Sequence, residues 1–450
     1  MNKIFLNGFF FLILFIAAAQ IVILQEEIVG AAIFILLICF ILIVCEDILA
    51  TTLPFLLICL FVLSQYDSYS TFITFKWMLA PLIFALVFHF VVYYKKIKIG
   101  ASFYGNAAVA LAVSLGGIGI VSAAEYFNGA TIYYIAGLGV GMLAVYVYIK
   151  AQIAERSEYD IRDKFITLIY IAGIFACFMV LRYYILDFEN FWATKTLVNF
   201  QARNNISTFL MISLPIPFYF AIKNDLHMLS GFLMYGCIVL SGSRGGLVFG
   251  TVEMLFCLIY LIAFNKKKIF YACFTVILIA FGVYAFSFVN KLYEVRISGG
   301  LISIDEARAK LLIRSIDDFK SSPIFGKGLG YSGNSDLYDP RKFAMNWYHM
   351  MLPQIIGSLG MIGVCAYSYQ LFVRAKLVLA NITPSSVAYA ISYIGLLLMS
   401  QVNPGEFCPL PYQLIAVMLF IFLEKPKNPK VVDEILVEKF ETVKNYAELT

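Results

Sequence analysis

About fourteen long apolar segments dominate this sequence, and each approaches the length that a helix needs to cross a lipid bilayer. A hydrocarbon core of about 30 Å requires roughly 20 apolar residues per helix. The segments lie near 4–24, 28–45, 48–64, 77–94, 103–123, 130–149, 165–187, 205–222, 226–241, 246–264, 268–288, 347–373, 385–401 and 409–424. The first continues to Leu24, which favours an uncleaved helix over a cleaved signal peptide. This pattern predicts an all-α, polytopic transmembrane helical bundle of about 12–14 spans.

The composition excludes several other classes of protein. The chain is 62% hydrophobic and 14% charged, whereas soluble proteins carry about 25% charged residues. Soluble domains, disorder, coiled coils and secreted disulfide scaffolds are therefore excluded. Eight of the nine cysteines lie in apolar runs, and no CxxC metal spacing occurs. A net charge of +5 is weak evidence for a nucleic-acid partner, so we expect no nucleic acid, no metal and no cofactor.

The basic residues predict the orientation of the bundle. With the N-terminus inside, Lys and Arg gather in the inner loops, near 95–98, 150–164, 266–268 and 374–376. This is the positive-inside pattern. We therefore expect a multi-pass membrane protein with both termini in the cytoplasm. The predicted parts are spans 1–11 (1–288), an extracytoplasmic loop (289–346), spans 12–14 (347–424) and a cytoplasmic tail (425–450).

The long loop at 289–346 is the predicted functional segment, because long loops usually carry function. Ser303 to Glu306 forms a capping-box pattern, which predicts an amphipathic helix from about Ile304 to Lys320. We expect this helix to lie on the outer leaflet. A glycine-rich turn, 323–330, follows it, and its backbone is suited to close approach of a ligand.

Three unusual sequences fall at the predicted outer face, each where a helix begins and runs inward. They contain Arg203 (201–205), Arg244 (241–246) and His349 (346–349). Helix N-termini bind anions through free N–H groups and the helix dipole. Arginine adds bidentate donors suited to phosphate oxygens. If these helices converge, the site is suited to a diphosphate.

Histidine is scarce, and by this topology His349 is the only one of three near the outer face. A helix N-terminus disfavours imidazolium, so His349 is a candidate general base for a sugar hydroxyl. Alternative interpretations are open. Arg203 and Arg244 also suit headgroup anchors, and His349 suits an aromatic belt. Glu253 lies at membrane depth and is either functional or a structural member.

Four stretches, in this order, resemble the O-antigen ligase and O-antigen polymerase superfamily of bacterial membrane glycosyltransferases. They are Ser241 to Gly246; Ala307-Arg308; Ser322 to Gly330; and His349 followed by Leu352 and the glycines at 357, 360 and 363. Together they span 241–363. One residue departs from the family pattern, because Met350 stands directly after His349, where the family usually has Asn.

The resemblance implies a GT-C-like architecture and a metal-independent, inverting glycosyltransferase. Its donor would be an undecaprenyl-diphosphate-linked glycan, and its acceptor a hydroxyl of a glycan or lipid at the outer face of the membrane. Carried over, Arg244 and Arg308 would bind the diphosphate, and His349 would activate or orient the acceptor. We add Arg203, Ser243, Gly328 and Gly330 as candidate binding residues. Membrane lipids and other envelope polysaccharide assembly proteins are the expected partners.

Three alternatives remain open at this point. The favoured function is polymerisation of O-antigen or other surface polysaccharide repeat units. A ligase would instead transfer the finished chain to lipid A core or another acceptor. A lipid-linked oligosaccharide flippase would also have 12–14 spans, but transporters line a midplane cavity with ionisable residues, whereas the polar candidates here gather at one face. The third alternative to polymerisation is an inactive scaffold in an envelope-assembly complex.

Overall fold

The computed structural model describes residues 2–62, 76–117, 135–157, 160–186, 196–198, 201–296, 306–329, 348–380, 382–403, 405 and 410–424. Its first half contains the helices α1 (Asn2–Phe5), α2 (Gly8–Leu24), α3 (Glu27–Val44), α4 (Thr52–Val62), α6 (Leu79–Tyr93), α7 (Ala101–Gly116), α9 (Gly141–Ile149) and α10 (Ile161–Leu186). Short 3-10 or π-helical turns, η1 (Leu49–Thr51), η2 (Lys76–Met78), η4 (Ala136–Val140) and η5 (Lys150–Ala154), adjoin them.

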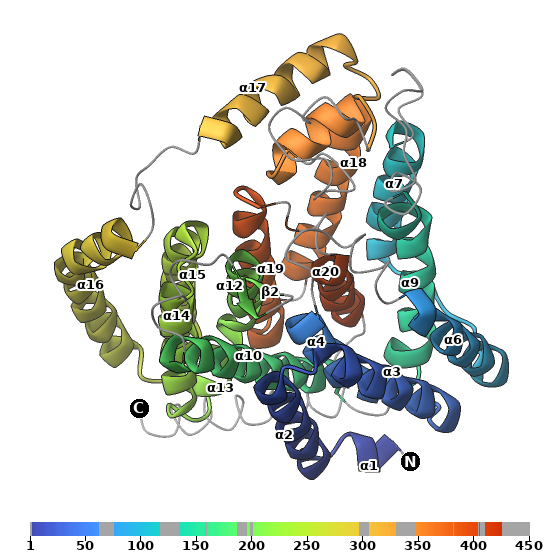
Figure 1. Cartoon of the computed structure of the whole chain (residues 1–450), viewed down its shortest axis with the longest axis horizontal. Helices are drawn as coiled ribbons and strands as arrows, with labels where there is room; N and C mark the ends of the chain where they lie inside the picture. Colours follow the sequence, from blue (N-terminus) through green and yellow to red (C-terminus); the bar gives the residue numbers. More distant parts are fainter. Residues whose placement is uncertain are drawn as a thin grey trace, which may run out of the picture.

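The second half begins with a small antiparallel pair, β1 (Thr196–Val198) and β2 (Gln201–Ala202). It continues with α12 (Arg203–Ser213), α13 (Pro215–Ala221), α14 (His227–Leu240), α15 (Arg244–Phe264), α16 (Lys268–Arg296), α17 (Glu306–Ser321), α18 (Met351–Ala380), α19 (Pro384–Ser400) and α20 (Leu410–Glu424). The strand pair is too small to change the class, and the all-α prediction is confirmed (Figure 1).

Each apolar segment predicted to span a membrane contains at least one of these helices. Within the described residues, seven helices are long and apolar enough to cross a membrane, and six shorter apolar helices accompany them. Many large apolar side chains on the outside of the bundle are exposed, most of all along α16, where Tyr284 is 82% exposed. Lipid is the solvent that such a surface requires. The protein is therefore a polytopic helical membrane bundle.

One end of the bundle collects the residues predicted to face the cytoplasm. The buried Lys150 ammonium lies 3.0 Å from the carboxylate of Glu424 at the end of α20. At the same end, Arg162 donates to the carbonyls of Phe422 and Leu423. The structure thus groups the predicted inner residues, and the assignment of this end to the cytoplasm remains a prediction.

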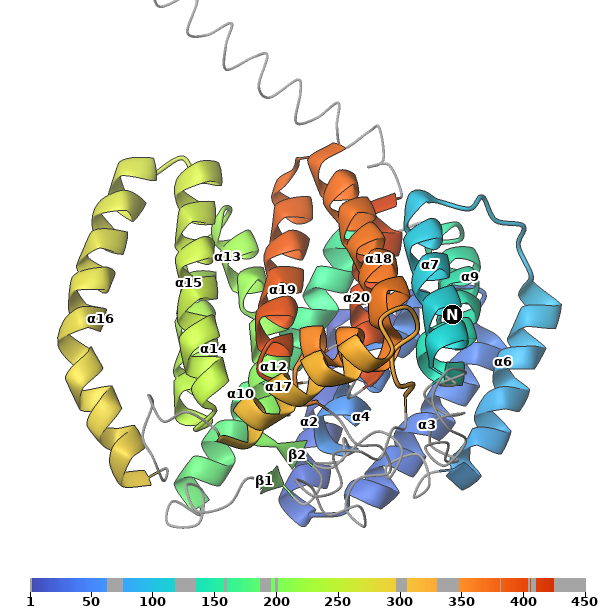
Figure 2. The same ribbon diagram turned by 90° about the horizontal axis from the view of Figure 1, so that it is seen from above.

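Helix α16 extends to Arg296, beyond the predicted end of its span at 288, and stands at the edge of the bundle (Figures 1 and 2). A tyrosine fixes it at each end. The Tyr271 hydroxyl donates to Asp225 at 2.6 Å, and the Tyr293 hydroxyl donates to the carbonyl of Val239 at 2.9 Å. The buried Tyr293 explains the longer helix, because the chain stays helical until this ring is packed.

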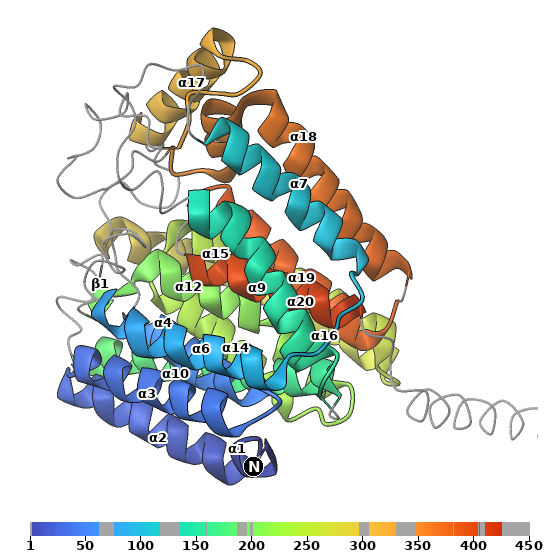
Figure 3. The same cartoon turned by 90° about the vertical axis from the view of Figure 1, so that its right-hand side faces the viewer.

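Helix α18 is interrupted at Gly360, where the backbone adopts φ 61° and ψ −151°. We expected one continuous span from 347 to 373, whereas the chain forms one helix before Gly360 and another after it. The part before the break packs against α17, which crosses the end of the bundle opposite the inner end described above (Figures 2 and 3). Hydropathy could not predict this break, because the residues on both sides of Gly360 are apolar.

Candidate functional site

The N-termini of α12 and α15 lie side by side, and hydrogen bonds between short polar side chains hold them there. The Ser207 and Ser241 hydroxyls are 2.7 Å apart, and the Ser243 hydroxyl donates to Asn204 Oδ1 at 2.8 Å. The helices approach so closely that a Cβ on Gly246 would lie 2.8 Å from Cβ of Ser207. Two of the three predicted outer sites therefore converge.

This convergence places Arg203 and Arg244 close enough for their charges to repel each other. Arg203 also interacts electrostatically with Tyr293 of α16. Its Nη1 atom is buried and has no hydrogen-bond partner among the described residues. A buried donor without a partner is costly and rare. Two arginines whose charges interact, one of which has a buried N–H without a partner among the described residues, are suited to binding an anion.

Ser243 is the N-cap of α15, and its hydroxyl accepts from the N–H of Gly246 at 3.1 Å. Capping by serine stabilises a helix N-terminus. Because the same hydroxyl donates to Asn204, Ser243 fixes the start of α15 relative to α12. This is a structural role, and substrate binding by Ser243 remains a prediction.

The turn after α17 closes the break in α18. The carbonyls of Pro323 and Ile324 accept from the N–H groups of Met361 and Ile362, and Lys327 and Gly328 donate to the carbonyls of Gly357 and Ser358. The backbone N–H and C=O groups that lose their helical partners at Gly360 are thereby hydrogen-bonded, as buried backbone groups require.

The glycines of this turn are needed for its shape. Gly326 and Gly328 have φ of 69° and 90°, and a Cβ on Gly326 would lie 2.4 Å from the backbone of Ser358. We expected the turn to approach a ligand, whereas the amide of Gly328 is paired within the protein. Binding by Gly328 is untested, and Gly330 lies outside the described residues.

His349 lies immediately before α18 in a left-handed backbone conformation, with φ 56°. The preceding residue, Tyr348, is buried, and its hydroxyl donates to Asp318 of α17 at 2.5 Å. The N–H of Tyr348 donates to Gln354 Oε1 at 3.0 Å. His349 itself is half-buried, so it lies near the start of α18 without being sealed in the core.

The predicted amphipathic helix is present as α17, and its capping-box residues before Glu306 lie outside the described residues. Arg308 is half-buried in its first turn. The predicted face, which comprises Leu311, Leu312, Ser315, Ile316 and Phe319, is divided: Leu311, Ser315 and Asp318 face inward, while Leu312, Ile313 and Ile316 are exposed. An exposed apolar edge suits a helix at a membrane surface.

Arg203 and Arg244 thus form one group, and His349 and α17, which carries Arg308, form another. Both groups lie at the same end of the bundle (Figures 2 and 3). Sequence patterns identified Arg203 and Arg244, because both broke the positive-inside rule, whereas Arg308 was a candidate through the family resemblance. They missed Asn204, Ser207 and Asp318, since a polar residue 30 or more positions from its partner carries no local signal.

Glu253 lies deeper in α15 and is completely buried against α19. Neither carboxylate oxygen has a hydrogen-bond partner in the described part of the chain, and a Cβ on Gly395 would lie 2.3 Å from Oε1. Glu253 belongs to the α15–α19 contact, about two turns below the arginines. No group of three potential metal-binding side chains occurs among the described residues.

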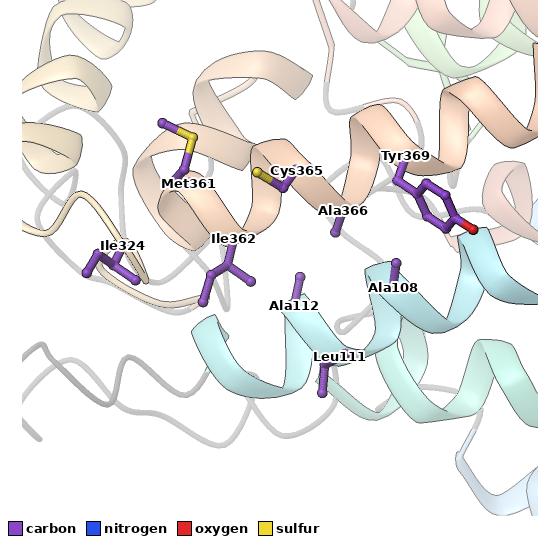
Figure 4. A pocket seen from close by; sticks show the side chains of 9 residues that line it. All are labelled: Ala108, Leu111, Ala112, Ile324, Met361, Ile362, Cys365, Ala366 and Tyr369. Atoms are coloured by element: carbon purple, nitrogen blue, oxygen red, sulfur yellow. The ribbon is translucent and has the colours of Figure 1, made fainter.

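An apolar groove of about 430 Å³ lies between α7 and the second part of α18 (Figure 4). Its walls include Leu111, Met361 and Tyr369, and small residues such as Ala108 and Ala366 contribute to its lining. Ile324, from the turn that closes the break in α18, lies at one end. The groove therefore adjoins the elements that hold His349.

Comparison with known proteins identifies one family. Residues 229–368 match the O-antigen ligase family model (Wzy_C). The match includes Arg244, Arg308 and His349, and it confirms the predicted resemblance to the O-antigen ligase and polymerase superfamily. No curated protein matches the chain. The family match supports an O-antigen ligase or polymerase type of membrane enzyme.

Proposed function

We propose that this protein transfers a glycan from undecaprenyl diphosphate to an acceptor hydroxyl at the outer face of the bacterial cytoplasmic membrane. The observation that carries the proposal is the pair formed by Arg203 and Arg244 at two adjoining helix N-termini, where Nη1 of Arg203 is buried and has no hydrogen-bond partner in the described part of the chain. A diphosphate satisfies this arrangement, since it supplies several anionic acceptor oxygens. Arg308 on α17 is the third proposed ligand.

The proposed reaction is a single displacement. The acceptor oxygen forms a bond to the anomeric carbon while the bond from that carbon to the diphosphate oxygen breaks, which inverts the configuration. The hydroxyl proton moves to His349, and the negative charge left on the lipid diphosphate is stabilised by the arginines. Preorganised donors suit such a leaving group, so the proposed reaction requires no metal. The loop that carries α17 would exclude water.

Polymerisation of surface polysaccharide repeat units is the favoured reaction, with a lipid-linked glycan as acceptor. Ligation to lipid A core or another acceptor is the second candidate. The description of the matching family as O-antigen ligase supports this second reaction. A flippase has less support. The arginines gather at one end of the bundle. Glu253, at 0% exposed, is the most deeply buried carboxylate among the described residues, where Glu27, Asp47 and Asp318 are 2%, 3% and 6% exposed.

The active-site proposal is tested by Arg244→Ala and His349→Ala, each reconstituted in membranes with lipid-linked glycan. We expect both variants to fold, to leave the donor unconsumed and to lose transfer. His227→Ala is a matched control, because this histidine lies at the start of α14, at the opposite end of the bundle from Arg244. Normal transfer by both active-site variants would refute the site.

Polymerase and ligase are distinguished by the products in cells. Deletion of a polymerase reduces the ladder of glycan chain lengths to single repeat units. Deletion of a ligase leaves chain length unchanged and abolishes attachment to the final acceptor. We expect the first result, and the second would exclude polymerisation.

A further inference from the structure

We propose that Tyr348 and Asp318 are positioning residues for His349, and that through them α17 sets the orientation of the proposed base. This inference rests on the proposed function. Tyr348 directly precedes His349, while Asp318 lies on α17, and the Tyr348 hydroxyl donates to Asp318 Oδ2 at 2.5 Å. Both side chains are buried, with Tyr348 1% and Asp318 6% exposed. Neither is among the residues to which a role was assigned above.

The backbone of His349 needs such support. A left-handed conformation is unfavourable for a residue other than glycine, and it persists where the surroundings determine it. The residue after His349 is fixed, because the carbonyl of Met350 accepts from the N–H of Gln354 at 2.9 Å and begins α18. The residue before it, Tyr348, must therefore be fixed as well, or the peptide would relax.

Tyr348 is held at three points. Its N–H donates to Gln354, its hydroxyl donates to Asp318, and its ring lies against Gly357, where a Cβ would be 2.7 Å from ring atom Cζ. Of these contacts, the one with Asp318 is the link to another element. If the hydroxyl contact is lost, the ring can shift, and the backbone of His349 shifts with it.

The link also connects two parts of the proposed site. Arg308 and Asp318 lie on the same helix, ten residues apart, which corresponds to about 15 Å along the helix axis. Leu311, Ser315 and Asp318 face the protein along that length. A movement of α17 that brings Arg308 toward a diphosphate therefore moves the partner of Tyr348 too.

The test compares Tyr348→Phe and Asp318→Ala with the wild type in reconstituted transfer. A 1 Å displacement of a catalytic group can cost about 10²-fold in rate. We expect kcat to fall roughly 10-fold or more while KM for the lipid-linked donor stays within about twofold, since neither residue contacts the donor. Asp318→Asn keeps an acceptor oxygen for the tyrosine and should recover most of the rate.

Asp317→Ala is the matched control. Asp317 is the neighbouring residue on the same helix, but its side chain is 64% exposed and pairs with Lys320 at 3.5 Å. We expect Asp317→Ala to transfer glycan at the wild-type rate. Thermal unfolding of each purified variant checks that the protein is folded. If Asp318→Ala does not fold, the conservative variants Tyr348→Phe and Asp318→Asn still provide the test.

Double variants separate positioning from simple stabilisation. In the His349→Ala background, Asp318→Ala should cause no further loss of the residual transfer, since the group that it orients is absent. An equal loss in both backgrounds would overturn the inference. If His349→Ala loses transfer but Tyr348→Phe and Asp318→Ala keep full transfer, the positioning inference is overturned and the proposed function is left intact. Normal transfer by His349→Ala would overturn both.

Discussion

At the scale of single residues, the two converging arginines are the most informative feature of the molecule. Like charges repel each other, and the charges of Arg203 and Arg244 are close enough to do so, so a protein that keeps these two side chains together has a reason to keep them. Binding of an anion is the simplest one. Nη1 of Arg203, which is buried without a hydrogen-bond partner among the described residues, independently indicates an anion. Its N–H needs an acceptor, which is a requirement separate from the charge.

Arg244→Lys tests whether the fork of the guanidinium matters. Lysine keeps the charge but cannot donate two parallel hydrogen bonds to a phosphate. We expect transfer by Arg244→Lys to fall between that of the wild type and that of Arg244→Ala, for which removal of one preorganised donor predicts a loss of about 10²–10³-fold. Steady-state rates of lipid-linked glycan transfer measure this. Equal rates for lysine and arginine would show that charge alone suffices.

The sequence was sufficient to identify Arg203, Arg244 and His349 as candidates, because rare charges at predicted outer helix starts are conspicuous in a chain with 14% charged residues. It was insufficient to show that Arg203 and Arg244 meet. That depends on Ser207 with Ser241 and on Asn204 with Ser243, and serine or asparagine near a helix end is too common to indicate a particular partner.

At the scale of secondary-structure elements, close contact between α12 and α15 is what brings the arginines together. Small residues allow helices in membranes to approach closely, and Gly246 provides this at the crossing. The apolar runs predicted the existence of both helices correctly. They predicted neither the close crossing nor the break in α18. Each depends on a single glycine in an apolar run, and the role of that glycine depends on residues far away in the sequence.

Gly246→Ala should therefore separate the two helix starts. The new Cβ would lie 2.8 Å from Ser207 Cβ, and overpacking of this kind costs about 1–3 kcal/mol. We expect a lower unfolding temperature and weaker binding of a diphosphate lipid. Gly282→Ala in α16 is the control, because a Cβ there meets nothing within 4 Å. Loss of stability in both variants alike would contradict this explanation.

Gly360→Ala tests the break in α18. Alanine there combines a positive φ of 61° with a Cβ 2.6 Å from the amide nitrogen of Gly326. We expect destabilisation of at least about 1–2 kcal/mol from the left-handed backbone alone, together with reduced transfer, because the turn and the part of α18 next to His349 shift. Thermal unfolding and transfer rates are the measurements. Wild-type stability would show that the break tolerates a side chain.

At the scale of the whole molecule, the two ends of the bundle have different characters. One end holds Lys150, Arg162 and Glu424 in a buried network between α10, α20 and the start of η5. The other holds Arg203, Arg244 and the start of α18. The positive-inside pattern predicts this separation from sequence, because alternation of spans places every second loop on the same side, and which end faces the cytoplasm stays a prediction.

Glu424→Ala tests the importance of the first end. The side chains of Lys150 and Glu424 are only 5% and 4% exposed, and removal of one partner of a buried pair costs about 3–5 kcal/mol. Asp317→Ala, which removes an exposed pair, should cost no more than about 1 kcal/mol. Chemical unfolding in detergent compares the two. Similar small losses would show that the Lys150–Glu424 pair contributes little.

The central claim is that Arg203 and Arg244 together bind a lipid diphosphate, and binding of undecaprenyl diphosphate to the purified protein tests it most directly. The measurement compares the wild type with the Arg203→Gln/Arg244→Gln double variant, using Lys96→Gln, an exposed residue in the predicted inner loop, as control. We expect wild type and control to bind alike and the double variant to lose binding at least about 10²-fold. Binding of equal strength by all three proteins would contradict the claim.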